Sequence, residues 1–356
     1  MSRKHFSWLF FVTFLAAALV LMLPGKTGRE SGFEQSDFLP ELAGQANDID
    51  WVRLTGAGGT TIATLRRKND AWVVEESSGY RADWEQLKSL LAGLARARVI
   101  EMKTDNPDFY DRLGVEDIGA ADAAGVLVEF SEGSGLPAVI IGSSARTRSG
   151  QYARLQDSAA SVLIDSPLSL PKTTSGWLDT DIIDIADAEV VEYEIRHPDG
   201  GVVKAVKASA DDENFELQDI PDGREIKSAW NVNAPANSLA ALTLEAVTPA
   251  VNHNWDESVQ YRVLTADGLT VDADLMAVEN PAAESGDQEH WLRLRAGVYT
   301  TSLDSVADTA VDQEATLERA ENINARADGW AYRIPRYKYD PMTRNMEDLL
   351  KSIDVE

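Results

Sequence analysis

Few residues of the chain have the types and spacing that enzyme chemistry requires. Its four histidines are His5, His197, His253 and His290, and no two of them stand four residues apart with a glutamate between, as in a zinc-protease helix. The chain has no cysteine, which excludes thiolate zinc sites, cysteine nucleophiles, disulfides and a lipid-modified N-terminal cysteine. It also lacks a Gly-x-Ser-x-Gly elbow, a P-loop and a dinucleotide-binding glycine motif. We therefore expect no enzyme activity and no catalytic, cofactor-binding or metal-binding residues.

Two charged clusters have alternative interpretations. Arg146 and Arg148 lie in the glycine-bounded segment 141–150, where they are suited to bind an anion, but a solvated hairpin loop is the favoured interpretation. The second cluster holds carboxylates that a glycosidase or a calcium site would use. Its spacing fits no calcium loop, and a solvated acidic face is favoured. The cluster consists of Asp179, Asp181, Asp184, Asp187 and Glu189.

A third cluster, near the C-terminus, alternates cations with tyrosines. Such a patch is suited to meet an acidic protein surface or lipid headgroups. The favoured alternative is an edge strand whose tyrosines cover the core. The cluster consists of Tyr332, Arg333, Arg336, Tyr337, Lys338 and Tyr339. We expect a final helix from Pro341 to Ile353.

The composition indicates a folded, acidic protein. Of 356 residues, 44% are hydrophobic and 26% charged, which is typical of globular chains. The 59 acidic residues outnumber the 33 basic ones and give a net charge of −26. Such a body repels phosphate backbones, so a nucleic-acid partner is not expected.

The N-terminus predicts a membrane anchor in residues 1–30. An apolar run from Phe6 to Leu23 follows Arg3 and Lys4, and as a helix it would be about 27 Å long, close to the hydrocarbon thickness of a bilayer. The basic start favours a single-pass span of the cytoplasmic (inner) membrane with the N-terminus inside and the bulk of the chain in the periplasm. Cleavage of a signal peptide near Ala16–Ala18 is the alternative. Residues 31–49 are then a linker.

Beyond the linker, strand-like runs repeat in the same order, which predicts an internal duplication. Trp51 matches Tyr193, the glycine pair 58–59 matches 200–201, and Arg154 matches Arg293. In the first copy Asp83 is placed to cap a helix that carries an apolar stripe, namely Trp84, Leu87, Leu91 and Leu94. A later helix is expected to have one side formed by Leu317, Ala320, Ile323 and Asn324.

The predicted fold class is therefore α+β. An N-terminal transmembrane helix is followed by two tandem repeat units of antiparallel β-sheet with packed helices. We place the first repeat unit at 50–180 and the second, with a C-terminal helix, at 181–356.

These motifs together resemble a bacterial family, the domain-of-unknown-function family numbered 4340. The resemblance rests on W-V-x-L at 51–54, A-W-V-V-E at 71–75, D-R-L-G-V at 111–115, Q-Y-A-R-L at 151–155 and G-W-A-Y-R-I-P at 329–335. It implies a membrane-anchored protein with its repeats outside the cytoplasmic membrane. It also implies association with ABC-type transporters of the gliding-motility class and their auxiliary subunits. Members commonly carry proline before the first helix. Arg81 stands there in this chain and is expected to affect only a turn.

The function expected from the sequence is that of a non-enzymatic, membrane-anchored, extracytoplasmic binding or assembly protein, accessory to an ABC-type transport system. An envelope glycan hydrolase with a carboxylate pair is one alternative, and it requires a cleft and a carboxyl group of raised pKa. A cell-wall glycan-binding module is another. It requires exposed aromatic platforms, with Trp51, Trp72, Trp177 and Trp255 as the candidates, and we expect most of these to be buried.

Overall fold

The computed structural model describes residues 36–69, 71–146, 149–279, 288–299 and 313–352. These residues form mostly β-sheet with a few helices, which confirms the α+β class. The predicted anchor, Phe6 to Leu23, lies outside the described residues. Among the described helices, none combines the length and the apolar character that a membrane span needs.

The chain folds into two compact units that are discontinuous in sequence. The first contains residues 36–61 and 88–170, and the second contains 62–87 and 171–352. The sequence placed the boundary at 180/181 and did not anticipate that 62–87 group with the second half. Main-chain contacts explain this grouping. The Asp83 N–H donates to the Trp177 carbonyl at 2.8 Å, and Ala82 forms an isolated bridge with Leu178.

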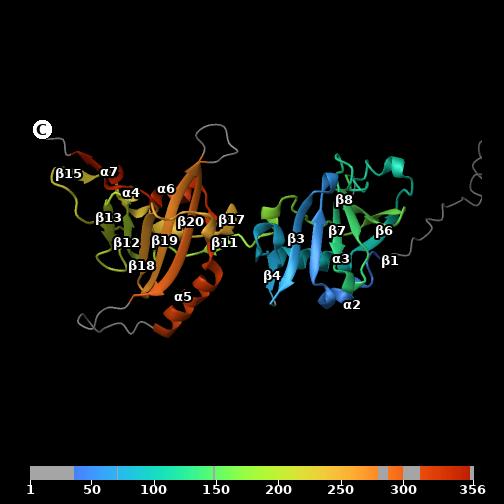
Figure 1. Ribbon diagram of the computed structural model, residues 1–356, viewed down its shortest axis with the longest axis horizontal. Coiled ribbons are helices and arrows are strands. Elements are labelled where there is room, and N and C mark those ends of the chain that lie inside the picture. The colour runs from blue at the N-terminus through green and yellow to red at the C-terminus, as the bar shows by residue number, and fades with distance from the viewer. Residues whose placement is uncertain (1–35, 70, 147–148, 280–287, 300–312, 353–356) are drawn as a thin grey trace, which may run out of the picture. The chain divides into compact units, whose positions relative to one another are not determined.

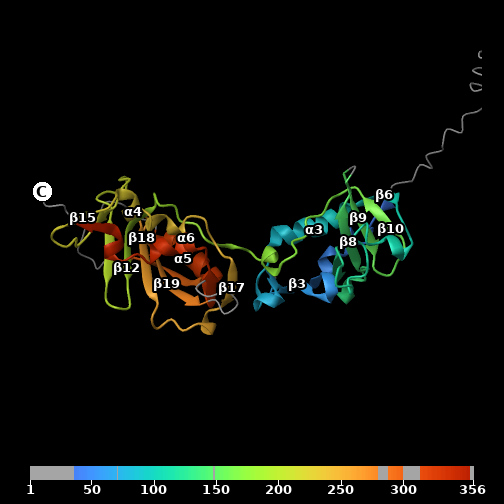
Figure 2. The same cartoon turned by 90° about the horizontal axis from the view of Figure 1, so that it is seen from above.

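The first unit is built on an antiparallel sheet with the order β1-β6-β10-β9-β8-β7-β2. Figure 2 shows β8, β9 and β10 lying together. As predicted, the glycine pair 58–59 follows β2 in a tight turn, with φ of 66° and 73°. The elements are β1 (Ser36–Asp37), α2 (Leu42–Gln45), β2 (Trp51–Thr55), β6 (Arg98–Met102), β7 (Val126–Phe130), β8 (Val139–Ser144), β9 (Gln151–Leu155) and β10 (Ser161–Ile164).

One face of this sheet is covered by residues 103–125, which we call the covering segment. Tyr110, Val115 and Ile118 from this segment form a core cluster with Leu127 of β7 and Ile140 of β8. Apolar burial of this kind contributes on the order of 25 cal/mol per Å², so the segment is bound tightly to the sheet.

The second unit is built on an antiparallel sheet with the order β14-β13-β12-β18-β19-β20-β21-β17. The elements assigned to this unit are β4 (Ala71–Val74), β5 (Tyr80–Arg81), β11 (Asp181–Ile183), β12 (Val190–Arg196), β13 (Val202–Val206), β14 (Glu216–Leu217), β15 (Arg224–Ile226), α4 (Ala229–Asn233), β16 (Leu242–Thr243), β17 (Ala246–Pro249), β18 (Val259–Thr265), β19 (Leu269–Glu279), β20 (Gln288–Val298), α5 (Gln313–Ala327), β21 (Trp330–Arg333), α6 (Arg336–Met342), α7 (Met346–Leu349) and β22 (Leu350–Ser352). The unit boundaries pass through β3 (Thr61–Lys68) and α3 (Trp84–Arg96).

The two sheets connect their strands in the same order. In the first unit the strands run β6-β10-β9-β8-β7-β2, and in the second β17-β21-β20-β19-β18-β12. Along the chain, the first unit forms β2 and then β6, β7, β8, β9 and β10. The second unit forms β12 and then β17, β18, β19, β20 and β21. Arg154 on β9 therefore corresponds to Arg293 on β20. That the two units arose by duplication stays a prediction.

Helix α5 lies along β19 and β20, as Figure 1 shows. Its buried residues are Thr316, Ala320 and Ala327, whereas Leu317 is half-exposed, so the predicted apolar side was placed wrongly at that residue. Beyond Leu292, where the pairing of β20 with β21 ends, the amide of Asn324 takes the place of a neighbouring strand. It accepts from the Ala296 N–H at 2.8 Å and donates to the Ala296 carbonyl at 2.9 Å.

Two further expectations are corrected. The Asp83 side chain caps α3 as predicted, because it accepts from the Gln86 N–H at 2.9 Å. Trp84 is 49% exposed, however, and the buried stripe consists of Leu87, Leu90 and Leu94.

In the tail, the strand ends at Arg333, and the next tyrosines and Lys338 lie on α6 rather than on an edge strand. The predicted helix 341–353 is replaced by the end of α6, α7 and β22. Helix α6 begins directly after Pro335, whose fixed φ suits the residue before a helix.

Candidate functional site

The described histidines do not form a catalytic or metal-binding group. The ring of His197 contacts the Arg344 carbonyl at 3.1 Å, His290 packs on Tyr339, and His253 packs on Trp291. Within the described parts of the chain, no three His, Asp or Glu side chains converge as metal ligands. His5 lies outside the described residues.

The anion candidate and the tryptophan candidates are placed as follows. Arg146 is exposed in the hairpin loop between β8 and β9, and Arg148 lies outside the described residues. Trp177 is fully buried, whereas Trp51, Trp72 and Trp255 are half-buried. None of these four offers the exposed platform that a glycan-binding module requires.

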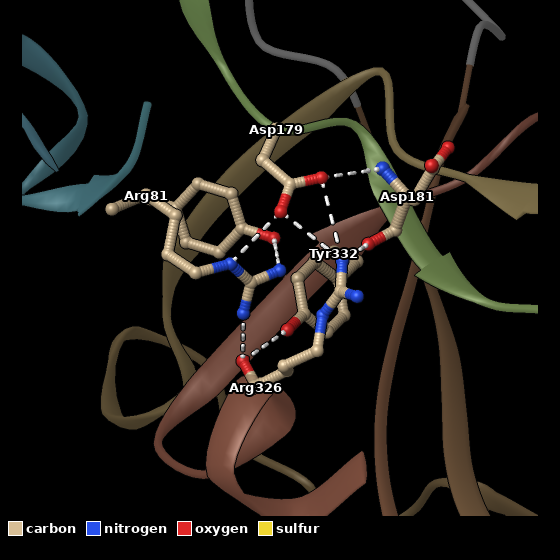
Figure 3. Close-up of polar contacts among 6 residues, drawn as sticks. Arg81, Asp179, Asp181, Arg326 and Tyr332 are labelled. Atoms are coloured by element: carbon tan, nitrogen blue, oxygen red, sulfur yellow. Dashed lines mark hydrogen bonds and ion pairs between the residues drawn. The ribbon is translucent and has the colours of Figure 1, made fainter. Parts of the chain in front are cut away.

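The acidic cluster of the sequence is divided among separate partners. Figure 3 shows Asp179 between two guanidinium groups, with Arg81 Nε and Arg326 Nη2 each 3.1 Å from Asp179 Oδ2. Arg326 also donates to the Asp181 carbonyl at 3.0 Å. Asp184 accepts from the Ala241 N–H, the Asp187 carbonyl accepts from Lys207, and Glu189 pairs with Arg319. The carboxylates of Asp179, Asp184 and Glu189 therefore have separate structural partners, and among the described residues the cluster does not converge on a common ion.

Arg81 is the centre of this arrangement and not merely part of a turn, which corrects the sequence expectation. It donates to the Arg326 carbonyl at 2.8 Å and to the Tyr80 hydroxyl at 3.0 Å. The Tyr332 hydroxyl donates to the same Arg326 carbonyl. Burial raises the pKa of Tyr332, so its phenol stays protonated and acts as a donor. The site joins β5 to the start of β11 and the end of α5, and it serves stability.

The tail cations are also dispersed. Arg333 pairs with Glu289 at 2.8 Å, Arg336 with Asp340 at 3.3 Å, and Lys338 donates to the Ala240 carbonyl at 2.6 Å. Tyr332 is buried, and Tyr337 is 69% exposed. These side chains do not form one continuous patch.

A different surface has the properties of a binding site, and the repeated sheet topology explains how it arises. Between β6 and β7 the first unit has the 23 residues 103–125, which cover one sheet face. Between the corresponding strands β17 and β18 the second unit has only the nine residues 250–258. No described segment therefore covers the corresponding face of the second sheet to the same extent.

This open face carries two cross-strand rows of polar side chains. The register places Lys204, Glu194, Arg262, Asp272 and Arg295 opposite one another in sequence across five strands. The neighbouring row consists of Arg196, Gln260, Asp274 and Arg293. Opposite charges on facing positions attract, so the first row, which alternates in sign, favours this register. We refer to these nine residues as the open face.

Most of the charges on the open face are paired with one another. Arg262 pairs with Asp272, Arg196 with Glu194, and Arg293 Nε with Asp274 Oδ2 at 2.8 Å. The hydrogen bond to Asp272 raises the pKa of the Arg262 guanidinium, which therefore stays charged. Such exposed pairs contribute about 0–1 kcal/mol each to stability. Their value lies more in holding the side chains in place.

Two exposed side chains of the open face have no partner among the described residues. A cavity of about 500 Å³ lies over it, with Trp330 and Asp328 at its margin. Arg295 forms no hydrogen bond or ion pair with any described residue, although its cross-strand neighbour is Asp272, because that carboxylate is taken by Arg262. The Gln260 amide likewise has no partner among the described residues. Their donors and acceptor are available to a ligand.

An aromatic group closes one end of the open face. The guanidinium of Arg293 lies 4.9 Å from the ring of Trp255, whose Nε1 donates to the Ala250 carbonyl. The ring of His253 lies 4.6 Å from that of Trp291, and the Nε2 of His253 is buried without a hydrogen-bond partner among the described residues. The short segment 250–258 therefore covers the face only at this end.

His253 is expected to make stability depend on pH. Burial lowers its pKa below the ordinary value, and the nearby Glu289 carboxylate opposes this effect. The folded protein then binds fewer protons at this residue than the unfolded chain does. The stabilising contribution is present above the unfolded pKa, about 6.5, and is lost as the pH falls through the folded value. We expect His253→Gln to lose less of its free energy of unfolding than the wild type between pH 7.5 and 5.5, measured by urea denaturation. His197→Gln is the control, and an equal pH dependence in wild type and His253→Gln would contradict the assignment.

The open face was missed in the sequence, although two signals for it are present. Polar or charged residues alternate with apolar ones at 259–263, 269–275 and 292–296. The segment between corresponding strands is also 14 residues shorter in the second unit, since 23 minus 9 is 14. Only the register shows that these positions lie on one face.

Comparison with known proteins identifies a family. Neither the curated proteins nor the solved structures include a significant match to the chain. The family model described as "Domain of unknown function (DUF4340)" matches residues 72–263, which is more than half of the chain. The chain therefore belongs to the DUF4340 family.

Proposed function

We propose that the protein is a non-enzymatic binding protein that presents the open face of its second unit to a partner protein. In this proposal Phe6 to Leu23 anchor the chain in the cytoplasmic membrane, and both units lie in the periplasm. The family resemblance adds that the partner is a subunit of an ABC-type transport system. Anchoring confines the open face near the membrane and raises its effective concentration, so a weak contact suffices.

One observation carries the proposal. The open face keeps Arg295 and Gln260 without partners among the described residues, whereas the corresponding face in the first unit is covered by the chain itself. A cavity of about 500 Å³ lined by fixed charged side chains is large enough to accept several residues of a partner. The ion pairs already fix the arginine side chains of this face, so these side chains lose little conformational entropy on binding.

The charged groups support binding rather than hydrolysis. A glycoside hydrolase needs a carboxylic acid of raised pKa. Burial acts to raise the pKa of Asp267, but hydrogen bonds from Thr265 and Leu269 and the Arg319 cation hold it below its usual range. The hydrogen bond from Arg224 lowers the pKa of Glu347. Both shifts are opposite to the one that a general acid requires.

Site-specific cross-linking in native membranes tests the proposal. A photoreactive amino acid replaces Arg295 in the full-length protein, and adducts are identified by mass spectrometry. We expect adducts with a subunit of a membrane transport complex. The matched control carries the same amino acid at Gln156, which follows Arg154 by two residues as Arg295 follows Arg293 and is also exposed. This position directly follows β9 of the covered sheet and should give no such adduct.

The same experiment tests the anchor. Deletion of residues 1–24 should move the protein to the soluble fraction and remove the adduct at position 295. Protein adducts of equal yield at 295 and 156, or none at 295, would contradict the proposed surface. Full function of the truncated protein in cells would contradict the tethering. Adducts with glycan alone would favour the glycan-binding alternative.

A further inference from the structure

The first unit shows how this fold covers a sheet face with a strand-poor segment. Arg154 on β9 is 4% exposed, and its guanidinium holds the covering segment in place. It donates to the Val115 carbonyl at 2.8 Å and pairs with Asp117 at 2.5 Å. The ring of Tyr110 lies 4.7 Å from the same guanidinium. One arginine thus binds a main-chain carbonyl, a carboxylate and an aromatic ring of a segment that consists of turns and a short 3-10 helix.

Arg293 occupies the corresponding place in the second unit but has no such segment among the described residues. Its Nε is bound to Asp274 and its face lies on Trp255. Its two terminal amino groups have no hydrogen-bond partner among the described residues, and its side chain is 43% exposed. Arg295, two residues further along the same strand, adds a guanidinium without a partner there. The donors that hold the covering segment in the first unit are therefore duplicated and left available.

The neighbouring positions define what such a segment must carry. Leu127 and Ile140 face the apolar side chains of the covering segment in the first unit. The register places Gln260 and Asp274 at the corresponding positions of the second unit. An apolar segment would bury the Gln260 amide without a partner, at a cost of about 1–3 kcal/mol. It would also remove water from the ion pair between Asp274 and Arg293. The occupant must therefore be polar where the covering segment is apolar.

We propose, on the basis of the proposed function, that the open face binds an acidic polypeptide segment of the partner. A carboxylate of this segment pairs with Arg295, its main-chain carbonyls accept from the terminal amino groups of Arg293, and polar side chains meet Gln260. The segment takes the place that residues 103–125 take in the first unit.

Selection from a random peptide library tests this inference without the natural partner. The full-length protein in detergent is the target, and enriched peptides are labelled and measured by fluorescence anisotropy. We expect enriched peptides to contain aspartate or glutamate. Their Kd should rise at least about tenfold in Arg295→Glu, and less in Arg295→Lys, which keeps the charge but not the planar donors. Higher salt should weaken binding.

A matched variant separates this contact from general charge. Arg336→Glu changes an arginine that is 77% exposed on α6, and it should leave peptide binding unchanged. Retained thermal unfolding temperatures show that the variants fold. Failure to enrich acidic peptides, or equal binding by wild type and Arg295→Glu, overturns the inference. If cross-linking at position 295 still captures a protein, the proposed function stands and only the acidic segment is rejected.

Discussion

Replacement of Arg154 by alanine is expected to release the covering segment from the first sheet. The guanidinium is 4% exposed and donates to three main-chain carbonyls, those of Val115, Gln156 and Ser158, at 2.8–3.0 Å. Hydrogen bonds from a charged group contribute about 1.5–3 kcal/mol each. In the alanine variant these three carbonyls lose their donor, and water does not readily replace it. We expect local stability to fall by about 3 kcal/mol or more. Hydrogen-exchange mass spectrometry should show roughly hundredfold faster exchange in residues 103–125.

Arg293→Ala is the matched control for this prediction, because Arg293 occupies the corresponding position in the second unit. Its single described ion pair, to Asp274, and its cation–π contact with Trp255 are partly solvated. We expect a loss of about 1 kcal/mol or less. Similar losses in both variants would mean that the buried donors of Arg154 do not hold the segment.

Replacement of Gly142 by alanine is expected to be as damaging, for a steric reason. Gly142 lies in β8 where the register with β9 shifts, and the covering segment passes directly over it. A Cβ at this position would lie 2.8 Å from the Gly114 carbonyl and 2.7 Å from Cγ1 of Val115, with the Leu113 carbonyl closer still. Main-chain carbonyls cannot relieve such an overlap by rotating about a side-chain bond. We expect a loss of about 3 kcal/mol or more in the free energy of unfolding of the first unit.

Gly133→Ala controls for the general effect of adding a methyl group to a glycine. Nothing lies within 4 Å of a Cβ built there, and the residue lies in a short 3-10 turn. We expect a change within about 0.5 kcal/mol. Urea denaturation with hydrogen exchange compares the two variants, and wild-type stability in Gly142→Ala would show that the segment can shift away from the strand.

The sequence predicted the strands and the α+β class because alternation and turn residues are local signals. The helix cap at Asp83 and the turn at Gly58 are likewise encoded within a few residues. The sequence did not predict the features that depend on contacts between residues far apart in the chain. The partners of Asp179, the role of Arg81 and the grouping of 62–87 with the second half all depend on contacts about 100 residues or more apart in the chain.

The candidate site was not predicted for a related reason. Arg293 was singled out as the counterpart of Arg154, but two arginines aligned in sequence do not reveal that one is buried and the other accessible. That difference depends on the length of a segment that precedes both strands. Gln260, Asp272 and Arg295 become one surface only through the register of three strands. Sequence patterning gives the face of each residue but not what lies over it.

The amide of Asn324 has a consequence for how the protein behaves at high concentration. By bonding to both main-chain groups of Ala296, it occupies a stretch of β20 that pairs with β19 on one edge but has no described strand on the other edge after Leu292. Unoccupied stretches of this kind recruit strands from other molecules and seed aggregates. We therefore expect the Asn324 amide to prevent this edge of β20 from pairing with a strand of another molecule.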